Sequence, residues 1–339
     1  MFDFYVKSHV GMYHVLSVND IPSVYIEDNV FVVIDRKVND LYYNFETDNP
    51  HCLAIDANEE VKTLDGVCKV IEFLTSNGFK KNSTLWAIGG GVIQDVVSFA
   101  ASILYRGVSW FFVPTTLLSQ CDSCIGSKTS INHNGAKNIL GGFHPPSNIF
   151  ICRKFLNTLP REEILSGVGE MLHYFLLNDD LELAMEMATD DDLLDNLDKY
   201  IDKSLSIKCK MIERDEFDKG PRNVFNYGHT FGHAIEIVSN YAINHGQAVT
   251  LGMMIANFIS LSRGVINKEK YYRLQTILST IMVDFKIDDM DAYMAVLAKD
   301  KKNVGSDLTC ILIHDGMFGC KTNVSYEEVR KAVQEILGR

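Results

Sequence analysis

The sequence is short of positive charge. Its 32 lysine and arginine residues are outnumbered by 44 aspartates and glutamates, so the formal net charge is −12. A surface of this sign does not attract nucleic acid or an anionic membrane, although it leaves room for a local basic pocket. We therefore expect neither nucleic acid nor a membrane as a partner. The net charge does not exclude a small anionic ligand bound in such a pocket.

Long apolar runs are also missing. No stretch approaches the ~20 apolar residues that a membrane-spanning helix needs. The N-terminal sequence MFDFYVKSHV lacks the basic segment, apolar run and cleavage site of a signal peptide. Hydrophobic residues make up 47% of the 339 residues, enough for a sizeable core. We expect a cytoplasmic protein of about two domains.

Disulfides are not expected. The eight cysteines are scattered, and a chain of this size does not need covalent links to fold. Cys121 and Cys124 form a lone CxxC, without the second pair that would indicate a metal or redox site. We therefore expect reduced thiols.

The motif HExxH is absent, but a related pattern is present. His229 and His233 are four residues apart, so a helix would place them on one face. Thr230 stands where a zinc peptidase has its glutamate base, which excludes that class. His245 follows after a short break. A metal would satisfy buried imidazoles, and core histidines satisfied by the protein itself are the alternative.

The first half contains a glycine-rich turn without the spacing GxGxxG. A predicted strand, LWAI (85–88), leads into GGG (89–91) and then into an apolar helix. Such a turn lets a pyrophosphate approach backbone N–H groups at the start of the helix. A tight turn that binds nothing is the alternative. Asp35, directly after the predicted strand VFVVI (30–34), would bind a ribose hydroxyl or simply end a turn.

Residues 119–146 have a polar composition. The segment is rich in glycine, serine, asparagine and lysine, and it follows the predicted strand WFFVP (110–114). We expect a long loop in which Lys128 and Lys137, with neighbouring amides, would hold a phosphate. A solvated loop without a ligand is the alternative.

From about residue 151 the pattern changes to long amphipathic helices with acidic starts, such as 190–212. This shift predicts a domain boundary between 150 and 151. LTCILI (308–313) predicts a late strand, and Ser325 with Glu328 forms a capping box that starts the last helix.

Taken together, these segments resemble the 3-dehydroquinate synthase family, within the sugar phosphate cyclases. The resemblance covers most of the chain, from about Glu59 to Lys302. It is carried by the combination and order of GGGVIQD (89–95), YRG (105–107), PTTLLSQCDSCIGSKTSIN (114–132), AKN (136–138), TLPRE (158–162), GVGEML (167–172), KCKMIERDE (208–216), RNVFNYGHTFGHAIE (222–236) and NHGQAV (244–249). A glycerol-dehydrogenase-like polyol dehydrogenase is the second interpretation, but that family lacks the DSxxGxKTxxN segment.

The resemblance implies a Rossmann-like α/β NAD-binding domain over 1–150, an all-α domain over 151–339 that binds metal and substrate, and a homodimer. It implies a lyase that uses NAD and Zn²⁺, with Co²⁺ as an alternative ion. The family converts 3-deoxy-D-arabino-heptulosonate 7-phosphate to 3-dehydroquinate of the shikimate pathway, by oxidation, phosphate elimination, reduction and aldol ring closure.

The resemblance also implies which residues form the site. The zinc ligands would be Glu170, His229 and His245, which leave coordination positions open for substrate. The expected NAD contacts are Asp35, Glu59, Lys62, Gly89, Gly90, Gly91, Asp95, Thr115, Thr116 and Lys137. The expected substrate contacts are Lys128, Asn138, Asn226 and His233, with Asp122 near the metal, Lys208 and Arg222 for a carboxylate, Arg106 lent by the dimer partner, and Lys301, for which Lys302 is the alternative match.

Some positions depart from the family pattern. His173 replaces a lysine that contacts substrate, and we keep it as a site candidate although it is shorter and near-neutral. Gln94 and Ser127 stand where the family has glycines. Cys124 stands where it has a serine, and Gln247 stands where it has a glutamate. Because Lys208 and Arg222 are retained, we expect an active enzyme whose substrate carries a carboxylate. A cyclase of a different sugar phosphate in a secondary pathway and a metal- and NAD-binding scaffold without turnover are the alternatives.

Overall fold

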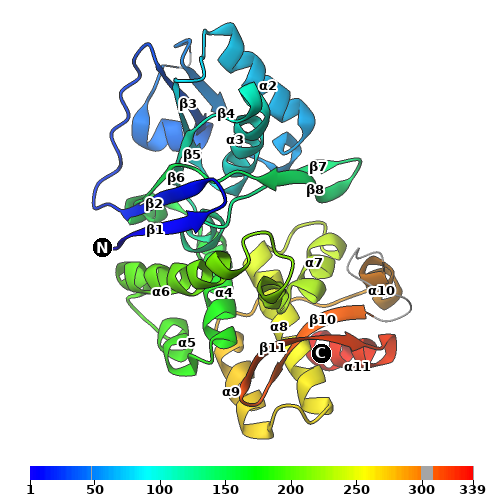
Figure 1. The fold of residues 1–339 in the computed structure, drawn as a ribbon. Coiled ribbons are helices and arrows are strands. Elements are labelled where there is room, and N and C mark those ends of the chain that lie inside the picture. Colours follow the sequence, from blue (N-terminus) through cyan, green and yellow to red (C-terminus); the bar gives the residue numbers. More distant parts are fainter. Residues whose placement is uncertain (47, 299–307, 339) are drawn as a thin grey trace. The chain divides into compact units, whose positions relative to one another are not determined.

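The computed structural model describes residues 1–46, 48–298 and 308–338 (Figure 1). The chain forms two compact units, which consist of Met1–Leu159 with Leu197–Phe217 and of Pro160–Asn196 with Asp218–Arg339. The predicted boundary between residues 150 and 151 does not coincide with the division into these units. The first unit continues to Leu159, and the chain returns to it at Leu197. The assignment of NAD binding to 1–150 and of metal and substrate binding to 151–339 stays a prediction.

A seven-stranded sheet forms the core of the first unit, with the order β1-β2-β9-β6-β5-β3-β4. Neighbouring strands are parallel except for the antiparallel pair β1 and β2. The strands are β1 Asp3–Ser8, β2 Gly11–Ser17, β3 Val30–Asp35, β4 Cys52–Ile55, β5 Thr84–Gly89, β6 Trp110–Pro114 and β9 Asn148–Ile151. The strands predicted at 30–34, 85–88 and 110–114 are confirmed, because inner parallel strands are buried on both faces and read as continuous apolar runs.

Most helical segments of the first unit lie between its strands in the chain, whereas η5 (Arg153–Thr158) and α6 (Leu193–Arg214) follow the last strand (Figure 1). The helical segments are α1 Arg36–Val38, α2 Leu64–Ser76, α3 Gly91–Ile103 and most of α6, with the short segments η1 Asn39–Tyr43, η2 Glu59–Val61, η3 Leu104–Arg106, η4 Ser119–Ser123 and η5. Helix α3 starts two residues after β5 and packs on β5 and β6. The glycine-rich turn therefore lies at the carboxyl end of a parallel strand, where open α/β sheets bind ligands.

The prediction of a long loop over residues 119–146 is wrong. The structure has a β-hairpin there, formed by β7 Lys128–His133 and β8 Ala136–Phe143. Its turn residues Asn134 and Gly135 have φ angles of 50° and 75°, as two-residue hairpin turns require. The polar composition of the segment favoured a loop. Two hairpin signals were present: the Asn-Gly turn, and an alternation along the strand in which every second residue, here Thr129 and Ile131, is buried.

In the part of the second unit that the structure describes, the secondary structure is helical apart from one two-stranded sheet. Its elements are α4 Arg161–Leu177, α5 Leu181–Ala188, η6 Pro221–Asn226, α7 His229–Val238, α8 His245–Ser262, α9 Lys268–Ser279, α10 Met290–Ala298, β10 Leu308–His314, β11 Met317–Val324 and α11 Tyr326–Leu337. The strand predicted at 308–313 and the capping box at Ser325 are confirmed, and the β10–β11 pair adds a hairpin to the expected all-α domain. Within the described residues, no helix is long and apolar enough to cross a membrane.

Candidate active site

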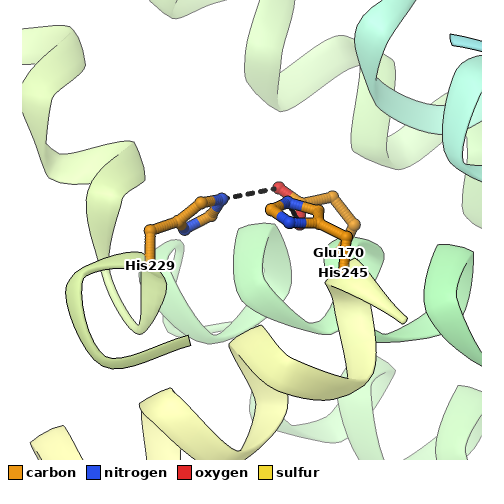
Figure 2. Close-up of side chains that lie close together, drawn as sticks. All are labelled: Glu170, His229 and His245. Atoms are coloured by element: carbon orange, nitrogen blue, oxygen red, sulfur yellow. Dashed lines mark ion pairs between the residues drawn. The ribbon is translucent and has the colours of Figure 1, made fainter. Parts of the chain in front are cut away.

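Three side chains converge in the second unit from three different helices. Glu170 comes from α4, His229 is the first residue of α7, and His245 is the first residue of α8 (Figure 2). Nε2 of His229 lies 3.7 Å from Oε1 of Glu170, and Nε2 of His245 lies 3.7 Å from Oε2 of Glu170. One ligand atom from each residue lies within 4.8 Å of the others. Two imidazoles and one carboxylate at this spacing can hold a divalent metal ion with coordination positions left for a substrate.

Glycines beside the ligands bring these helices together. A Cβ on Gly246, next to His245, would lie 1.8 Å from the main-chain oxygen of Ser166 in α4. A Cβ on Gly169, next to Glu170, would lie 2.3 Å from the main-chain oxygen of Gly246. No side chain fits at either place, so α4 and α8 approach each other closely beside Glu170 and His245. Glu170 and His245 can therefore lie close together because the residues next to them, Gly169 and Gly246, have no side chains.

Both histidines have their other ring nitrogen occupied. Nδ1 of His229 donates to the main-chain oxygen of Tyr227 at 3.1 Å, and Nδ1 of His245 donates to Oε2 of Glu236 at 3.3 Å. This leaves the lone pair of each Nε2 for a metal, and such partners fix the orientation of metal-binding imidazoles. Burial lowers the pKa of His229 well below its usual value, helped by the neighbouring imidazoles. A neutral imidazole is the form that binds metal.

Two more histidines lie beside Glu170, His229 and His245. The ring of His233 lies 5.7 Å from that of His245, and His233, Glu236 and His245 form a second group whose ligand atoms are close enough for a metal. We favour the group with Glu170, because Nδ1 of His245 already bonds Glu236 while its Nε2 faces Glu170. His173 is 0% exposed and packs against the rings of Tyr227 and His229, so direct contact with a substrate would require these rings to move.

Two further expected substrate contacts of the second unit lie in the short helical segment η6. Arg222 and Asn226 belong to η6, where Arg222 is 4% exposed and the side-chain amide of Asn226 donates to the main-chain oxygen of Asn223 at 2.9 Å. Lys301 and its alternative Lys302 lie outside the described residues.

The glycine turn and the two threonines expected to bind NAD lie together in the first unit. Gly90 precedes the first residue of α3, and no side chain caps this helix. A Cβ on Gly90 would lie 2.8 Å from Cγ2 of Thr116, while a Cβ on Gly91 would meet nothing within 4 Å. The backbone N–H of Thr115 donates to the oxygen of Gly89 at 3.0 Å. An uncapped helix start behind small residues suits a pyrophosphate.

Four other expected NAD contacts form one polar cluster. Nζ of Lys62 lies 2.7 Å from Oδ2 of Asp95, and Nζ of Lys137 lies 3.9 Å from Oε1 of Glu59. The side-chain amide of Asn132 donates to the same oxygen of Glu59 at 2.7 Å. The β7–β8 hairpin therefore contacts the residues between β4 and α2 through Glu59.

Asp35 lies apart from that cluster, at the carboxyl end of β3. Its carboxylate accepts the backbone N–H of Lys37 at 3.0 Å, and burial raises its pKa. It lines an open hollow of about 510 Å³ together with Asp56 and Asn58, which follow β4. Parallel strand ends side by side form the usual place for a nucleoside.

Three expected substrate contacts of the first unit have defined surroundings. Nζ of Lys208, on α6, donates at 2.7 Å to Oδ1 of Asp122. Lys128 is the exposed first residue of β7. Oδ1 of Asn138 accepts from the hydroxyl of Ser130 at 3.1 Å.

Arg106 lies in a strained turn. Tyr105, Arg106 and Gly107 have φ angles of 50°, 66° and 110°. Non-glycine residues adopt positive φ at an energetic cost, and such strain concentrates at functional sites.

The CxxC pair is not a reactive site. Cys121 and Cys124 are 0% and 1% exposed, and burial raises the pKa of Cys124 to about 12. No disulfide joins the eight cysteines, all of which lie among the described residues. Inert reduced thiols are the expected form of such buried cysteines.

Sequence reasoning did not find Glu236 or Glu216. Glu236 bonds His245, and Glu216 accepts hydrogen bonds from Ser8, His9 and Ser127. Glu236 follows His233 by one helical turn, a spacing that would have indicated a carboxylate beside the histidines. No local pattern joins Glu216 to Ser8.

Solved structures of sugar phosphate cyclases share this fold. A 2-deoxy-scyllo-inosose synthase, solved with carbaglucose-6-phosphate, NAD⁺ and Co²⁺, matches with a TM-score of 0.85 at 22% identity, over 99% of this chain and 100% of that one. ValA, a 2-epi-5-epi-valiolone synthase from Streptomyces hygroscopicus subsp. jinggangensis 5008 solved with NAD⁺ and Zn²⁺, matches with 0.84 at 24% identity, over 96% and 97%. A probable glycerol dehydrogenase from Sinorhizobium meliloti reaches only 0.61 at 13% identity, over 91% and 90%. The fold is therefore dehydroquinate synthase-like, as expected.

The sequence comparison narrows this class to one family. The family model for the 3-dehydroquinate synthase N-terminal domain matches residues 52–166, and the model for the C-terminal domain matches 167–303. The chain belongs to the 3-dehydroquinate synthase family. A 3-dehydroquinate synthase of Campylobacter concisus is 34% identical over 328 residues, 94% of each chain, and one of Clostridium tetani is 35% identical over 325 residues, 90% of this chain and 85% of the relative.

Proposed function

We propose that this chain is a 3-dehydroquinate synthase, a phosphate-eliminating carbon–oxygen lyase. Its substrate would be 3-deoxy-D-arabino-heptulosonate 7-phosphate, and its cofactors NAD and Zn²⁺, with Co²⁺ as an alternative ion. The observation that carries the proposal is the convergence of Glu170, His229 and His245 in a chain of this family. The relatives with this name cover nearly the whole chain.

The donor set fits the metal. Each imidazole has its Nδ1 bonded and its Nε2 directed to Glu170, as a metal site requires. When bound, the metal supplies a Lewis acid and NAD supplies a hydride acceptor and donor. The uncapped start of α3 and the cluster of Lys62 and Asp95 would hold the cofactor in the first unit.

The remaining site residues would bind and orient the substrate. Lys128, Asn138, Asn226 and His233 would contact the phosphate or hydroxyl groups, and the Lys208 and Arg222 cations would receive the carboxylate. Arg222 is buried, so an anion reaching it would be held where water screens little. Elimination of phosphate needs its negative charge to be stabilised as it leaves, which cations and amide donors provide.

We also propose that the protein is a cytoplasmic homodimer in which Arg106 serves the site of the partner. Ile103 and Tyr105, on the same turn, are 50% and 43% exposed. Large apolar side chains beside an exposed arginine are typical of an interface.

The deciding experiment measures phosphate release from 3-deoxy-D-arabino-heptulosonate 7-phosphate with NAD⁺ and Zn²⁺ or Co²⁺, with and without a chelator. Release that the chelator abolishes, with 3-dehydroquinate as product, is expected. No release, although NAD and metal bind, would reject this substrate. A panel of other sugar phosphates would then test a cyclase of a secondary pathway, which the replacement at His173 favours.

A further inference from the structure

Glu216 gathers four hydrogen-bond donors in the first unit. It lies just after α6 and is 9% exposed. Its Oε1 accepts the hydroxyls of Ser8 at 2.6 Å and Ser127 at 2.5 Å, and lies 3.1 Å from Nδ1 of His9. Its Oε2 accepts the backbone N–H of His9 at 2.8 Å. We call Ser8, His9, Ser127 and Glu216 the Glu216 cluster.

The Glu216 cluster fixes the backbone directly before Lys128. Ser127 has a φ angle of 65°, and its main-chain oxygen accepts from the N–H of His144 at 2.6 Å. The N–H of Gly126 donates to the hydroxyl of Tyr13, a buried residue of β2, at 3.1 Å. The hydroxyl, the carbonyl and the preceding amide are thus all held, which sets the direction in which the next side chain leaves the backbone.

The carboxylate is held in its charged form. Burial alone would raise the pKa of Glu216, but hydrogen bonds from Ser127, Ser8 and His9 keep it below its usual value. Hydrogen bonds to a charged acceptor are roughly twice as strong as neutral ones. An amide at this position would keep the size of the side chain and lose that strength.

We propose that Glu216 is a positioning residue that acts through Ser127 to aim Lys128 at the phosphate group of the substrate. This inference rests on the proposed function, in which Lys128 contacts substrate. It predicts that the affinity for phosphate falls when Glu216 is replaced. Glu216 would not bind the phosphate itself, because its two oxygens already accept hydrogen bonds from Ser8, His9 and Ser127. The cluster joins the β1–β2 turn to the start of β7, so residues far apart in sequence share in substrate binding.

The test compares Glu216→Gln, Ser127→Ala and the double variant with the wild type. Asp3→Asn is the matched control, because it alters the contact of Asp3 with His14 at 2.6 Å in the same hairpin without touching the cluster. We measure kcat and KM and the inhibition constant of inorganic phosphate. In Glu216→Gln we expect KM and the phosphate constant to rise about tenfold, the factor for one strong hydrogen bond. We expect kcat to change little, Ser127→Ala to have a smaller effect, and the double variant to resemble Glu216→Gln.

A wild-type KM and phosphate constant in Glu216→Gln would overturn the proposal, as would an equal rise in Asp3→Asn. If Glu216→Gln does not fold, Ser127→Ala decides by the same two constants. Hydrogen–deuterium exchange over 126–133 separates this inference from the proposed function. Should the wild type release no phosphate from any sugar phosphate, the function fails, and faster exchange in Glu216→Gln and Ser127→Ala but not Asp3→Asn still supports the positioning role. Unchanged exchange would reject it.

Discussion

Lys208 and Asp122 bind each other. The ammonium of Lys208 donates to Oδ1 of Asp122 at 2.7 Å and to its main-chain oxygen at 2.7 Å. The resemblance assigns the two residues to different parts of the substrate, so an incoming carboxylate has to compete with Asp122 for the same cation. The pair therefore holds Lys208 in place before substrate binds, which reduces the side-chain entropy lost on binding.

Replacing Lys208 by methionine tests this pairing. The side chains of Lys208 and Asp122 are 7% and 19% exposed, so the carboxylate loses a cation where water replaces it poorly. We expect the free energy of unfolding to fall by about 1–3 kcal/mol. The double variant with Asp122→Asn should lose less than the sum of the single variants. Urea denaturation of the four proteins measures this, and strictly additive losses would show that the contact contributes nothing.

Glu236 should control metal affinity through His245. In Glu236→Gln the imidazole keeps a hydrogen-bond acceptor but loses the nearby charge, and in Glu236→Ala it loses both. Changes of such partners weaken metal binding by about 10–100-fold. We expect the alanine variant to be weaker than the glutamine variant, and His229→Ala to be weaker than either. Competition with a chromophoric chelator gives the Zn²⁺ dissociation constants, and wild-type affinity in Glu236→Ala would show that Glu236 has no part in metal binding.

Much of the fold could be predicted because its signals are local. Strand β3 is a continuous apolar run and the last helix has its capping box, and both are confirmed. The β7–β8 hairpin was missed because its composition is polar, although Asn134-Gly135 carried the turn signal. Polar composition indicates that a segment is exposed to solvent, but it does not distinguish a loop from a hairpin. The Asn-Gly pair does, because these residues readily adopt the positive φ angles that a two-residue hairpin turn requires.

The site could be predicted only in part, for a similar reason. Resemblance supplied the group of Glu170, His229 and His245, whereas the spacing of His229 and His233 alone did not distinguish His233 from His245 as a partner of His229. Whether side chains meet depends on how closely helices approach, and that distance is set by Gly169 and Gly246. The pairing of Lys208 with Asp122 joins distant segments, so no local pattern indicates it.

The last helix should show a stability effect that depends on pH. Arg263 binds both carboxylate oxygens of Glu328, at 2.6 and 2.8 Å, and this hydrogen bond lowers the pKa of Glu328 to about 2. A carboxyl whose pKa is lower in the folded state stabilises the protein above its usual pKa, and this contribution is lost as pH falls towards 2.

Glu328→Gln should therefore lower the free energy of unfolding by about 1 kcal/mol near pH 6, since the pair is partly exposed and also belongs to the capping box. The difference from wild type should shrink between pH 4.5 and pH 2. Glu327→Gln, which removes a charge from the same helical turn, is the control. A difference that stays constant across this range would contradict the assigned pKa.

Arg106 offers a test of the dimer and of which subunit it serves. His229→Ala should lose its metal and activity while the first unit stays folded, and Arg106→Ala should lose activity while metal binding is retained. If Arg106 completes the partner's site, a mixed dimer of the two variants has one site with both residues intact. Reassorted mixtures should then regain roughly a quarter of the wild-type rate, because about half of the dimers are mixed and each has one intact site. If Arg106 serves its own subunit, both sites of the mixed dimer carry a lesion, and mixing restores nothing. Phosphate release before and after reassortment separates the two arrangements, and a monomer in sedimentation would remove the dimer proposal altogether.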